Sequence, residues 1–253
     1  MVTRSPYLDH PGPLAFAHRG GAGEAPENSW AAFEHAVSLG YRYMETDVRT
    51  TSDEVAVALH DPSLDRVADR PGVLRKMSWA QVQAHKLADG REPPLLEELL
   101  GAWPQLHWNI DVKRREAISP VVEAIKRTGS VNRVLVASFA GSRAARVRAA
   151  LGPELATGAG RLTVASLVVA KVVSFWPVSS DAVAAQVPPR DGLIPIVDAA
   201  FVRVCHRAGL AVHVWTINTS AEMDRLLDLG VDGIMTDRPT VLKEVLERRG
   251  QWA

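Results

Sequence analysis

The chain has 253 residues, of which 47% are hydrophobic, and its 29 lysine and arginine residues balance 29 aspartate and glutamate residues. This apolar content is enough for a packed core and excludes wholesale disorder, and the balanced charge excludes a basic stripe that would make nucleic acid the main partner. A single cysteine, Cys205, excludes a disulfide framework and a cysteine-based zinc site. Residues 1–12 hold no apolar run, so we expect no secretory signal peptide and a cytoplasmic protein.

Strand and helix patterns alternate along the chain. A short apolar strand is expected at 14–17, followed by a helix that starts at Asn28 or Ser29 and stops at Gly40. The remaining strands are expected at 41–48, 54–59, 106–112, 134–138, 155–158, 183–187, 211–217 and 233–235. The remaining helices are expected at 95–103, 118–128, 142–151, 198–208, 221–229 and 240–248. Residues 62–93 are predicted to form an insertion with one short helix near 78–85.

Strands that alternate with helices indicate parallel βαβ units. About eight such units predict an α/β fold, a (β/α)₈ TIM barrel, with a short insertion after the strand that ends at His60. A doubly wound open sheet would be favoured by a glycine-rich phosphate turn, but Gly20-Gly21-Ala22-Gly23 lacks the G-x-G-x-x-G spacing. No linker divides the chain, so we predict one domain over residues 1–253.

One segment, residues 162–178, is apolar apart from Lys171 and a few hydroxyl side chains. It lies at the lower edge of the length that crosses a bilayer, which takes about 20 residues. Lys171 inside the segment and Pro177 near its end favour a buried helix of a soluble domain. Contact with lipid, which would include Trp176, stays open but is not expected, and a true membrane span is the least favoured interpretation.

Two expected strands carry charges at alternating positions, where a buried strand is normally apolar. Because side chains alternate across a strand, Glu45 and Asp47 share one face, and so do Asp111 and Lys113. Buried carboxylates are costly unless positive charge meets them. Three carboxylates without a thiolate or a tight histidine cluster suit a hard divalent cation, so we predict a site for Mg²⁺ or Ca²⁺.

The carboxyl ends of the strands carry the active site in a (β/α)₈ barrel. Polar or aromatic residues stand at the end of nearly every expected strand, which indicates a pocket. These residues are His18, Arg19, Glu45, Asp47, His60, Asp111, Lys113, Ser138, Gln186, Trp215, Asn218, Thr236 and Asp237.

Short motifs extend this pattern over most of the chain. In order, they are His18-Arg19-Gly20, Pro26-Glu27-Asn28-Ser29, Glu45-Thr46-Asp47-Val48, His60-Asp61, Asn109-Ile110-Asp111-Val112-Lys113, Ser138-Phe139, Gln186-Val187-Pro188, Val214-Trp215-Thr216-Ile217-Asn218 and Asp232-Gly233-Ile234-Met235-Thr236-Asp237-Arg238-Pro239. Together they resemble the glycerophosphodiester phosphodiesterase family. Each motif alone is weak, whereas their ordered combination is specific.

The resemblance implies a metal-dependent enzyme that hydrolyses glycerophosphodiesters to glycerol 3-phosphate and an alcohol. It implies His18 and His60 as the general acid/base pair, and by analogy with related phospholipase barrels we favour His18 as the base. Glu45 and Asp47 would be metal ligands, with Asp111 at the third ligand position. The family usually has glutamate at this third position, so the ligand is one methylene shorter here.

The chemistry of a phosphodiester suggests roles for three further residues. Arg19 and Lys113 would lie near phosphate oxygens and neutralise their charge, and Trp215 would form a wall for the glycerol or the alcohol. Simpler roles stay open, since Lys113 could form only a buried ion pair, and Trp215 could belong to the core. Glu27 and Asn28 could only cap the following helix.

The expected substrate is therefore a small glycerophosphodiester, without nucleic acid as a partner and with the oligomeric state left open. A second hypothesis keeps the same chemistry but acts on lipid-linked glycerophosphates at a membrane surface, as a lysophospholipase D does. A non-enzymatic phosphate-binding barrel would be expected to lack one of the acid/base histidines or metal-ligand carboxylates, and all are present. A sugar-phosphate isomerase is disfavoured by the acidic Thr236-Asp237 turn.

Overall fold

The computed structural model describes residues 5–173 and 178–252. Within them, parallel strands follow one another in the order β6-β5-β4-β2-β1-β11-β10-β7. A parallel bridge between Gly158 and Ala184 brings the two ends of this sheet together, so the predicted TIM barrel is confirmed. The barrel strands are β1 (Leu14–Ala17), β2 (Tyr43–Thr50), β4 (His107–Val112), β5 (Val134–Ala137), β6 (Ala156–Thr157), β7 (Ala184–Val187), β10 (Ala211–Val214) and β11 (Gly233–Thr236).

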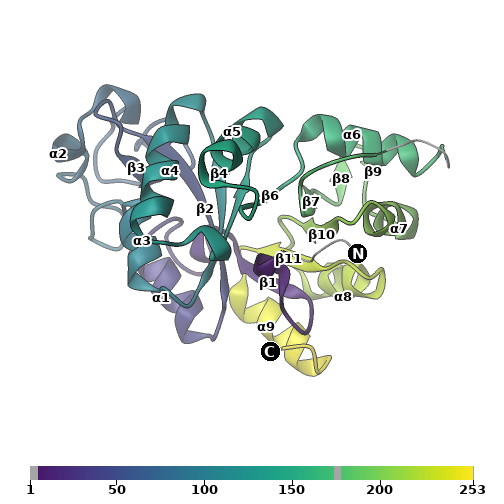
Figure 1. Ribbon diagram of the computed structural model, residues 1–253. Helices are drawn as coiled ribbons and strands as arrows, with labels where there is room; N and C mark the ends of the chain where they lie inside the picture. Colours follow the sequence, from purple (N-terminus) through teal and green to yellow (C-terminus); the bar gives the residue numbers. More distant parts are fainter. Residues whose placement is uncertain (1–4, 174–177, 253) are drawn as a thin grey trace.

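Helices surround the barrel (Figure 1). The main ones are α1 (Trp30–Ser38), α3 (Leu96–Ala102), α4 (Ile118–Arg127), α5 (Gly141–Leu151), α6 (Arg161–Ala170), α7 (Ala199–Arg207), α8 (Ser220–Asp228) and α9 (Pro239–Arg248). Short 3-10 turns stand at Pro6–Leu8, His18–Gly20, Leu74–Lys76, Arg115–Ala117 and Val131–Arg133. Of the two caps expected for α1, Ser29 is the one used, because its hydroxyl accepts a hydrogen bond from the Ala32 N–H at 3.1 Å.

In β4, apolar and polar side chains alternate, so the apolar ones face the core and the polar ones face the candidate site. Trp108, Ile110 and Val112 are fully buried in the hydrophobic core of the first half of the chain. Asn109 and Asp111 take the opposite face of the strand because consecutive side chains point to opposite sides. The polar residues of β4 therefore face the interior of the barrel.

The strand expected at 54–59 is not a barrel strand. It forms β3 (Ala56–Ala58), which runs antiparallel to β2 with Ala58 opposite Val48. Because β2 continues beyond the barrel and β3 returns toward it, His60 arrives at the mouth on a returning chain. The predicted insertion follows, contains α2 (Trp79–Val82), and has its own small apolar cluster that includes Leu64 and Val82.

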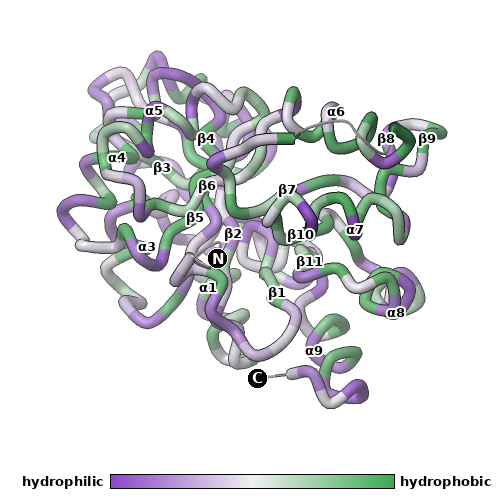
Figure 2. The backbone as a smooth tube through the Cα atoms, turned by 45° about the vertical axis from the view of Figure 1, so that its right-hand side comes forward, coloured by the Kyte–Doolittle hydropathy of each residue, from purple (hydrophilic) through white to green (hydrophobic). Residues whose placement is uncertain are grey.

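The apolar segment at 162–178 differs from the buried helix that was expected. Its residues 162–170 belong to α6, in which Leu167 and Ala170 are buried but Leu162 is 87% exposed. Figure 2 shows hydrophobic residues, in green, along this outer helix. None of the described helices is long and apolar enough to cross a membrane. Trp176 lies outside the described residues.

Candidate active site

The three predicted carboxylates lie on neighbouring strands at the carboxyl end of the barrel. In the parallel pairing of β2 with β4, Asp47 lies opposite Asp111 and Glu45 lies opposite Asn109. Glu45 and Asp47 are 4% and 1% exposed, respectively. The structure therefore brings together the side chains that were predicted to share a pocket, and it buries two of them almost completely.

Lys113 lies between two of these carboxylates. Its Nζ is 2.6 Å from Asp47 Oδ1 and 2.6 Å from Asp111 Oδ2. Burial alone would lower the pKa of Lys113, but the charges of Asp47 and Asp111 outweigh it and raise the pKa. Lys113 is therefore firmly cationic, and it forms the buried ion pair with Asp111 that was left open as its simpler role.

The loop after β1 contributes Arg19 to the same cluster. The Arg19 N–H donates to Glu45 Oε2 at 2.9 Å, and its Nε lies 3.0 Å from Asp47 Oδ2 as an ion pair. This backbone donation occurs in a turn where Arg19 has a φ of 52° and Gly20 a φ of 81°. A Cβ at Gly20 would lie 2.7 Å from the Ala32 Cβ, so glycine is needed there.

The pKa values of the three carboxylates are shifted in different directions. Burial raises the pKa of Asp47, but Lys113 and Arg19 outweigh burial and lower it. Burial, and next the charge of Asp47, raise the pKa of Glu45 to about 7. Burial also raises the pKa of Asp111, with Lys113 acting in the opposite direction. Glu45 thus lacks sufficient positive charge around it.

The shortage of positive charge around Glu45 indicates whether the site suits a metal. A divalent cation beside Glu45 would supply the missing charge, and oxygen ligands are those that Mg²⁺ and Ca²⁺ prefer, so the donor chemistry fits. In residues 5–173 and 178–252, however, no group of three or more His, Cys, Asp or Glu side chains stands ready to hold a metal ion. Asp47 and Asp111 are instead joined by the ammonium group of Lys113.

His18 is held by a carboxylate from the other end of the chain. Its Nδ1 is 2.6 Å from Asp237 Oδ1, and Asn218 Nδ2 donates to Asp237 Oδ2 at 2.9 Å. His18 Nε2 lies 3.8 Å from Glu45 Oε2. Burial lowers the pKa of His18, but Glu45 and Asp237 together outweigh it and raise the pKa.

His60 is held in a similar way by its neighbour. Its Nδ1 is 2.7 Å from Asp61 Oδ1, and Arg66 Nε donates to Asp61 Oδ2 at 2.7 Å. Arg66 also donates to both oxygens of Glu27, and Arg19 Nη1 donates to Glu27 Oε1 at 3.2 Å. A chain of charged contacts therefore leads from His60 through the insertion to Arg19.

These contacts replace the helix-capping roles left open for two residues. Glu27 joins Arg19 to Arg66, and Asn28 Nδ2 donates to Asp47 Oδ2 at 3.2 Å. Trp215, which follows β10, has its ring 6.0 Å from that of Phe139, which follows β5. Trp215 is half-buried and also packs against the buried cluster that includes Phe16 and Met235, so it contacts both the core and the barrel mouth.

The sequence assigned no role to three residues that complete this arrangement. Asp237 and Asn218 were visible only as polar residues after β11 and β10, without a partner. Arg66 lies in the insertion, where a charged residue is ordinary and gives no signal of its own. Only the closed barrel and the folded insertion place these side chains beside the two histidines.

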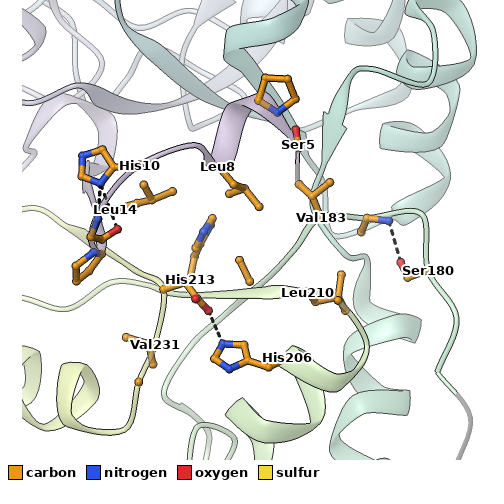
Figure 3. A pocket seen from close by; sticks show the side chains of 18 of the residues that line it. Ser5, Leu8, His10, Leu14, Ser180, Val183, His206, Leu210, His213 and Val231 are labelled. Atoms are coloured by element: carbon orange, nitrogen blue, oxygen red, sulfur yellow. Dashed lines mark hydrogen bonds and ion pairs between the residues drawn. The ribbon is translucent and has the colours of Figure 1, made fainter. Parts of the chain in front are cut away.

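A separate cavity of about 890 Å³ lies at the opposite end of the barrel (Figure 3). Its lining includes Leu14 and Ala211, which begin β1 and β10, together with a third histidine–aspartate pair, His206 Nε2 at 2.7 Å from Asp232 Oδ2. None of the predicted site residues lines this cavity. The candidate active site is therefore assigned by its chemistry rather than by cavity size.

Known proteins are similar to this chain in both sequence and fold. The model of the glycerophosphoryl diester phosphodiesterase family matches residues 18–241. The chain is 40% identical, over 97% of its own length and 95% of the relative's, to the Mycobacterium tuberculosis protein named "Probable glycerophosphodiester phosphodiesterase 2". It is 30% identical to a glycerophosphodiester phosphodiesterase of Caldanaerobacter subterraneus, over 94% of this chain and 99% of the relative.

Solved structures show the same architecture. A phosphodiesterase of Oleispira antarctica, solved in complex with the product sn-glycerol-3-phosphate, is similar with a TM-score of 0.75 and 23% identity, over 93% of this chain and 97% of that one. A glycerophosphodiester phosphodiesterase of Agrobacterium tumefaciens has a TM-score of 0.76 at 23% identity, over 93% and 99% of the two chains. The match to the family model over residues 18–241, together with the close relatives, establishes that this chain belongs to the glycerophosphoryl diester phosphodiesterase family and is an enzyme of that family.

Proposed function

We propose that this enzyme hydrolyses small glycerophosphodiesters to glycerol 3-phosphate and an alcohol, in the cytoplasm, with His18 and His60 as the acid/base pair. The observation that carries the proposal is that each histidine is held at Nδ1 by its own carboxylate, Asp237 or Asp61, beside the buried pair Glu45 and Asp47. The product complex of the Oleispira antarctica relative is consistent with the same product here.

The hydrogen bonds suggest how the histidines divide the proton transfers. With Nδ1–H donated to Asp237, the Nε2 of neutral His18 is free to accept the proton of the attacking hydroxyl. His60, whose Nδ1 contacts Asp61, would then give a proton through Nε2 to the leaving alkoxide. The P–O bond to the alcohol breaks as the bond to the attacking oxygen forms. If water attacks, glycerol 3-phosphate forms directly; if the 2-hydroxyl of glycerol attacks, a cyclic phosphate forms and water then breaks its P–O2 bond to give the same product.

Positive charge in the site would bind the phosphate. Arg19 and Lys113 are the cations beside the carboxylates, and Trp215 would contact the glycerol or the alcohol. Glu45, Asp47 and Asp111 would hold Mg²⁺ or Ca²⁺, which when bound acts as a Lewis acid on a phosphate oxygen. Because Asp111 Oδ2 is paired with Lys113, a cation held by Asp111 would compete with Lys113 for this carboxylate.

A lipid-linked glycerophosphate is the second candidate substrate. The protein named lysophospholipase D GDPD1 of Mus musculus is 29% identical to this chain, over 91% of this chain and 85% of the relative. The exposed apolar residues of α6, among them Leu162, favour this candidate.

The test is release of glycerol 3-phosphate from glycerophosphocholine and glycerophosphoethanolamine. The purified protein is treated with EDTA and then assayed with Mg²⁺, Ca²⁺ or Mn²⁺. We expect metal-restored release, and we expect His18→Ala and His60→Ala each to lower it about 10²–10⁴-fold while the folded state is kept. The control is His206→Ala, which removes a histidine of the remote pair at the other end of the barrel. Full release by either active-site variant would contradict its assigned role.

A further inference from the structure

Large apolar side chains that are exposed to solvent gather on one side of the molecule. In residues 5–173 and 178–252 there are eight of them, and only Val73 lies elsewhere, in the insertion. The other seven, which we call the apolar face, are Phe139, Leu162, Val169, Val172, Val173, Leu193 and Ile194. Such residues are normally scattered, so a gathering of this kind marks a surface that another body covers.

The apolar face is built from two adjacent elements. Leu162 and Val169 are seven residues apart and so lie on the same side of α6, and the helical turn continues to Val173, whose N–H donates to the Val169 carbonyl at 2.9 Å. The hairpin of β8 (Arg190–Asp191) and β9 (Ile194–Pro195) adjoins this helix, because Lys171 Nζ donates to the Pro195 carbonyl at 2.9 Å (Figure 1).

The hairpin also supplies the most exposed apolar side chain of the face. Leu193, at its turn, is 91% exposed, and the next residue, Ile194, is 63% exposed. Both are bulky aliphatic side chains with no cover from the rest of the described chain. They would insert into any apolar phase that the face meets.

One end of the apolar face borders the candidate active site. The Arg161 N–H donates to the Phe139 carbonyl at 3.2 Å, which joins the start of α6 to the rim residue after β5. Phe139 in turn contacts Trp215 at a ring distance of 6.0 Å. A surface that covered the apolar face would therefore lie next to the barrel mouth.

The helical part of the apolar face has no acidic side chain of its own. No acidic residue occurs in the sequence between Glu154 and Asp181, which includes the whole of α6. Arg161 is exposed at the start of α6, whereas Lys171 is paired with Asp198 Oδ2 at 3.0 Å and the exposed Arg190 of the hairpin has the exposed Asp191 beside it. Apolar side chains flanked by arginines are the arrangement that binds the interface of an anionic bilayer.

We propose that the apolar face docks the enzyme onto an anionic lipid surface, with the barrel mouth beside the headgroups. A lysophospholipid would then reach the site directly from the bilayer. This substrate class rests on the proposed function, whereas the docking itself does not. In the hydrolysis, the phosphate–headgroup P–O bond breaks, the water oxygen bonds to phosphorus, and the headgroup alcohol takes the proton.

The test is co-sedimentation with vesicles, because its readout does not depend on turnover. The full chain is mixed with vesicles of phosphatidylglycerol and phosphatidylcholine, or of phosphatidylcholine alone. We expect binding to the anionic vesicles and a loss of about tenfold or more in the triple variant Leu162→Asn/Leu193→Asn/Ile194→Asn. The matched control, Val73→Asn, changes an exposed apolar side chain away from the face and should bind normally.

Three results would overturn the docking proposal. The first is that the unaltered protein binds neither kind of vesicle, and the second is that the triple variant binds as well as the unaltered protein. The third is that neither protein binds vesicles, while the unaltered protein forms a dimer that the triple variant does not form. The last would make the face a contact between two copies. Hydrolysis of soluble glycerophosphocholine is measured in parallel. Hydrolysis without vesicle binding would contradict the docking proposal, and vesicle binding without hydrolysis would contradict the proposed function.

Discussion

The Nδ1 atom of His18 and the Oδ1 atom of Asp237 lie 2.6 Å apart, although 219 residues separate the two in the sequence. The barrel makes this contact by pairing its first and last strands, with Ala17 of β1 opposite Thr236 of β11. Each residue directly follows its strand, so the pairing brings both side chains to the mouth. Asp237 can therefore fix the tautomer and orientation of His18.

We expect Asp237→Asn to lower kcat about 10²-fold or more without unfolding the protein. An asparagine side chain can donate to Nδ1, which favours the tautomer that carries its proton on Nε2 and so cannot accept one there. Glu45 still raises the pKa of His18, but the contribution of Asp237 is lost. Steady-state hydrolysis of glycerophosphocholine, with circular dichroism to confirm folding, measures the effect.

The molecule supplies a matched control for this variant. His206 and Asp232 form a pair of similar geometry, with Nε2 and Oδ2 2.7 Å apart, at the opposite end of the barrel. Asp232→Asn should leave kcat within about twofold of the unaltered enzyme, since surface pairs contribute little. A similar loss in both variants would mean that general destabilisation, and not the tautomer of His18, explains the Asp237 result.

Arg66 is expected to act on turnover through His60. It donates to Asp61 and to both oxygens of Glu27, yet its side chain is 51% exposed. Because exposed pairs are weak, we expect Arg66→Gln to lower kcat only about three- to tenfold. Added guanidinium should restore part of the rate if Arg66 positions Asp61 and thereby His60, and Arg66→Lys should lie between the two.

A purely structural role for Arg66 would give a different result. Arg70, which is 57% exposed in the same insertion, pairs with Asp69 rather than with a site residue. Arg70→Gln should therefore keep the full kcat. Equal losses for the two variants, with no rescue by guanidinium, would exclude the positioning role of Arg66.

Local pattern predicted the parts of the site that lie on single strands. Side chains alternate between the two faces of β2 and of β4. This alternation alone places Glu45 on the same face as Asp47, and Asp111 on the opposite face from Ile110, without knowledge of the fold. The parallel register then follows from the barrel, which the alternation of strands and helices predicts. These residues could be read from the sequence because their positions depend on neighbours one or two residues away.

Contacts between distant segments could not be read in this way. Asp237 meets His18 only because the barrel closes, and Arg66 meets Glu27 only because the insertion folds back over the mouth. The exposure of Leu162 was missed for a related reason. An apolar helix is buried by default, and no local pattern shows that part of its surface lacks a covering layer.

Glu45→Gln should weaken metal binding strongly. The buried carboxylate lacks sufficient positive charge around it, so a divalent cation would supply the charge that this side chain is missing. We expect the Kd for Mg²⁺ or Ca²⁺ to rise about 100-fold or more. Isothermal titration calorimetry measures it directly. The exposed Glu34→Gln variant, which removes only a surface pair with Arg91, should bind as before, and unchanged binding by Glu45→Gln would exclude Glu45 as a ligand.

His213 is expected to make the stability of the barrel depend on pH. It is fully buried on β10, Gln186 Nε2 lies 3.2 Å from its Nδ1, and its Nε2 has no hydrogen-bond partner among the described residues. Burial lowers its pKa to about 4. The unfolded chain therefore binds a proton that the folded chain excludes, so the stabilisation is complete above about pH 6.5 and is lost as the pH falls toward 4.

The expected size follows from this difference in pKa. Between pH 7 and pH 5 the free energy of unfolding should fall by about 2 kcal/mol through His213 alone. His213→Asn removes the titrating group, so its stability, although lower at pH 7, should fall by about 2 kcal/mol less over the same interval. Urea unfolding of both proteins at the two pH values gives this difference. Parallel pH dependence in the two proteins would show that His213 is protonated as readily in the folded chain as in the unfolded one.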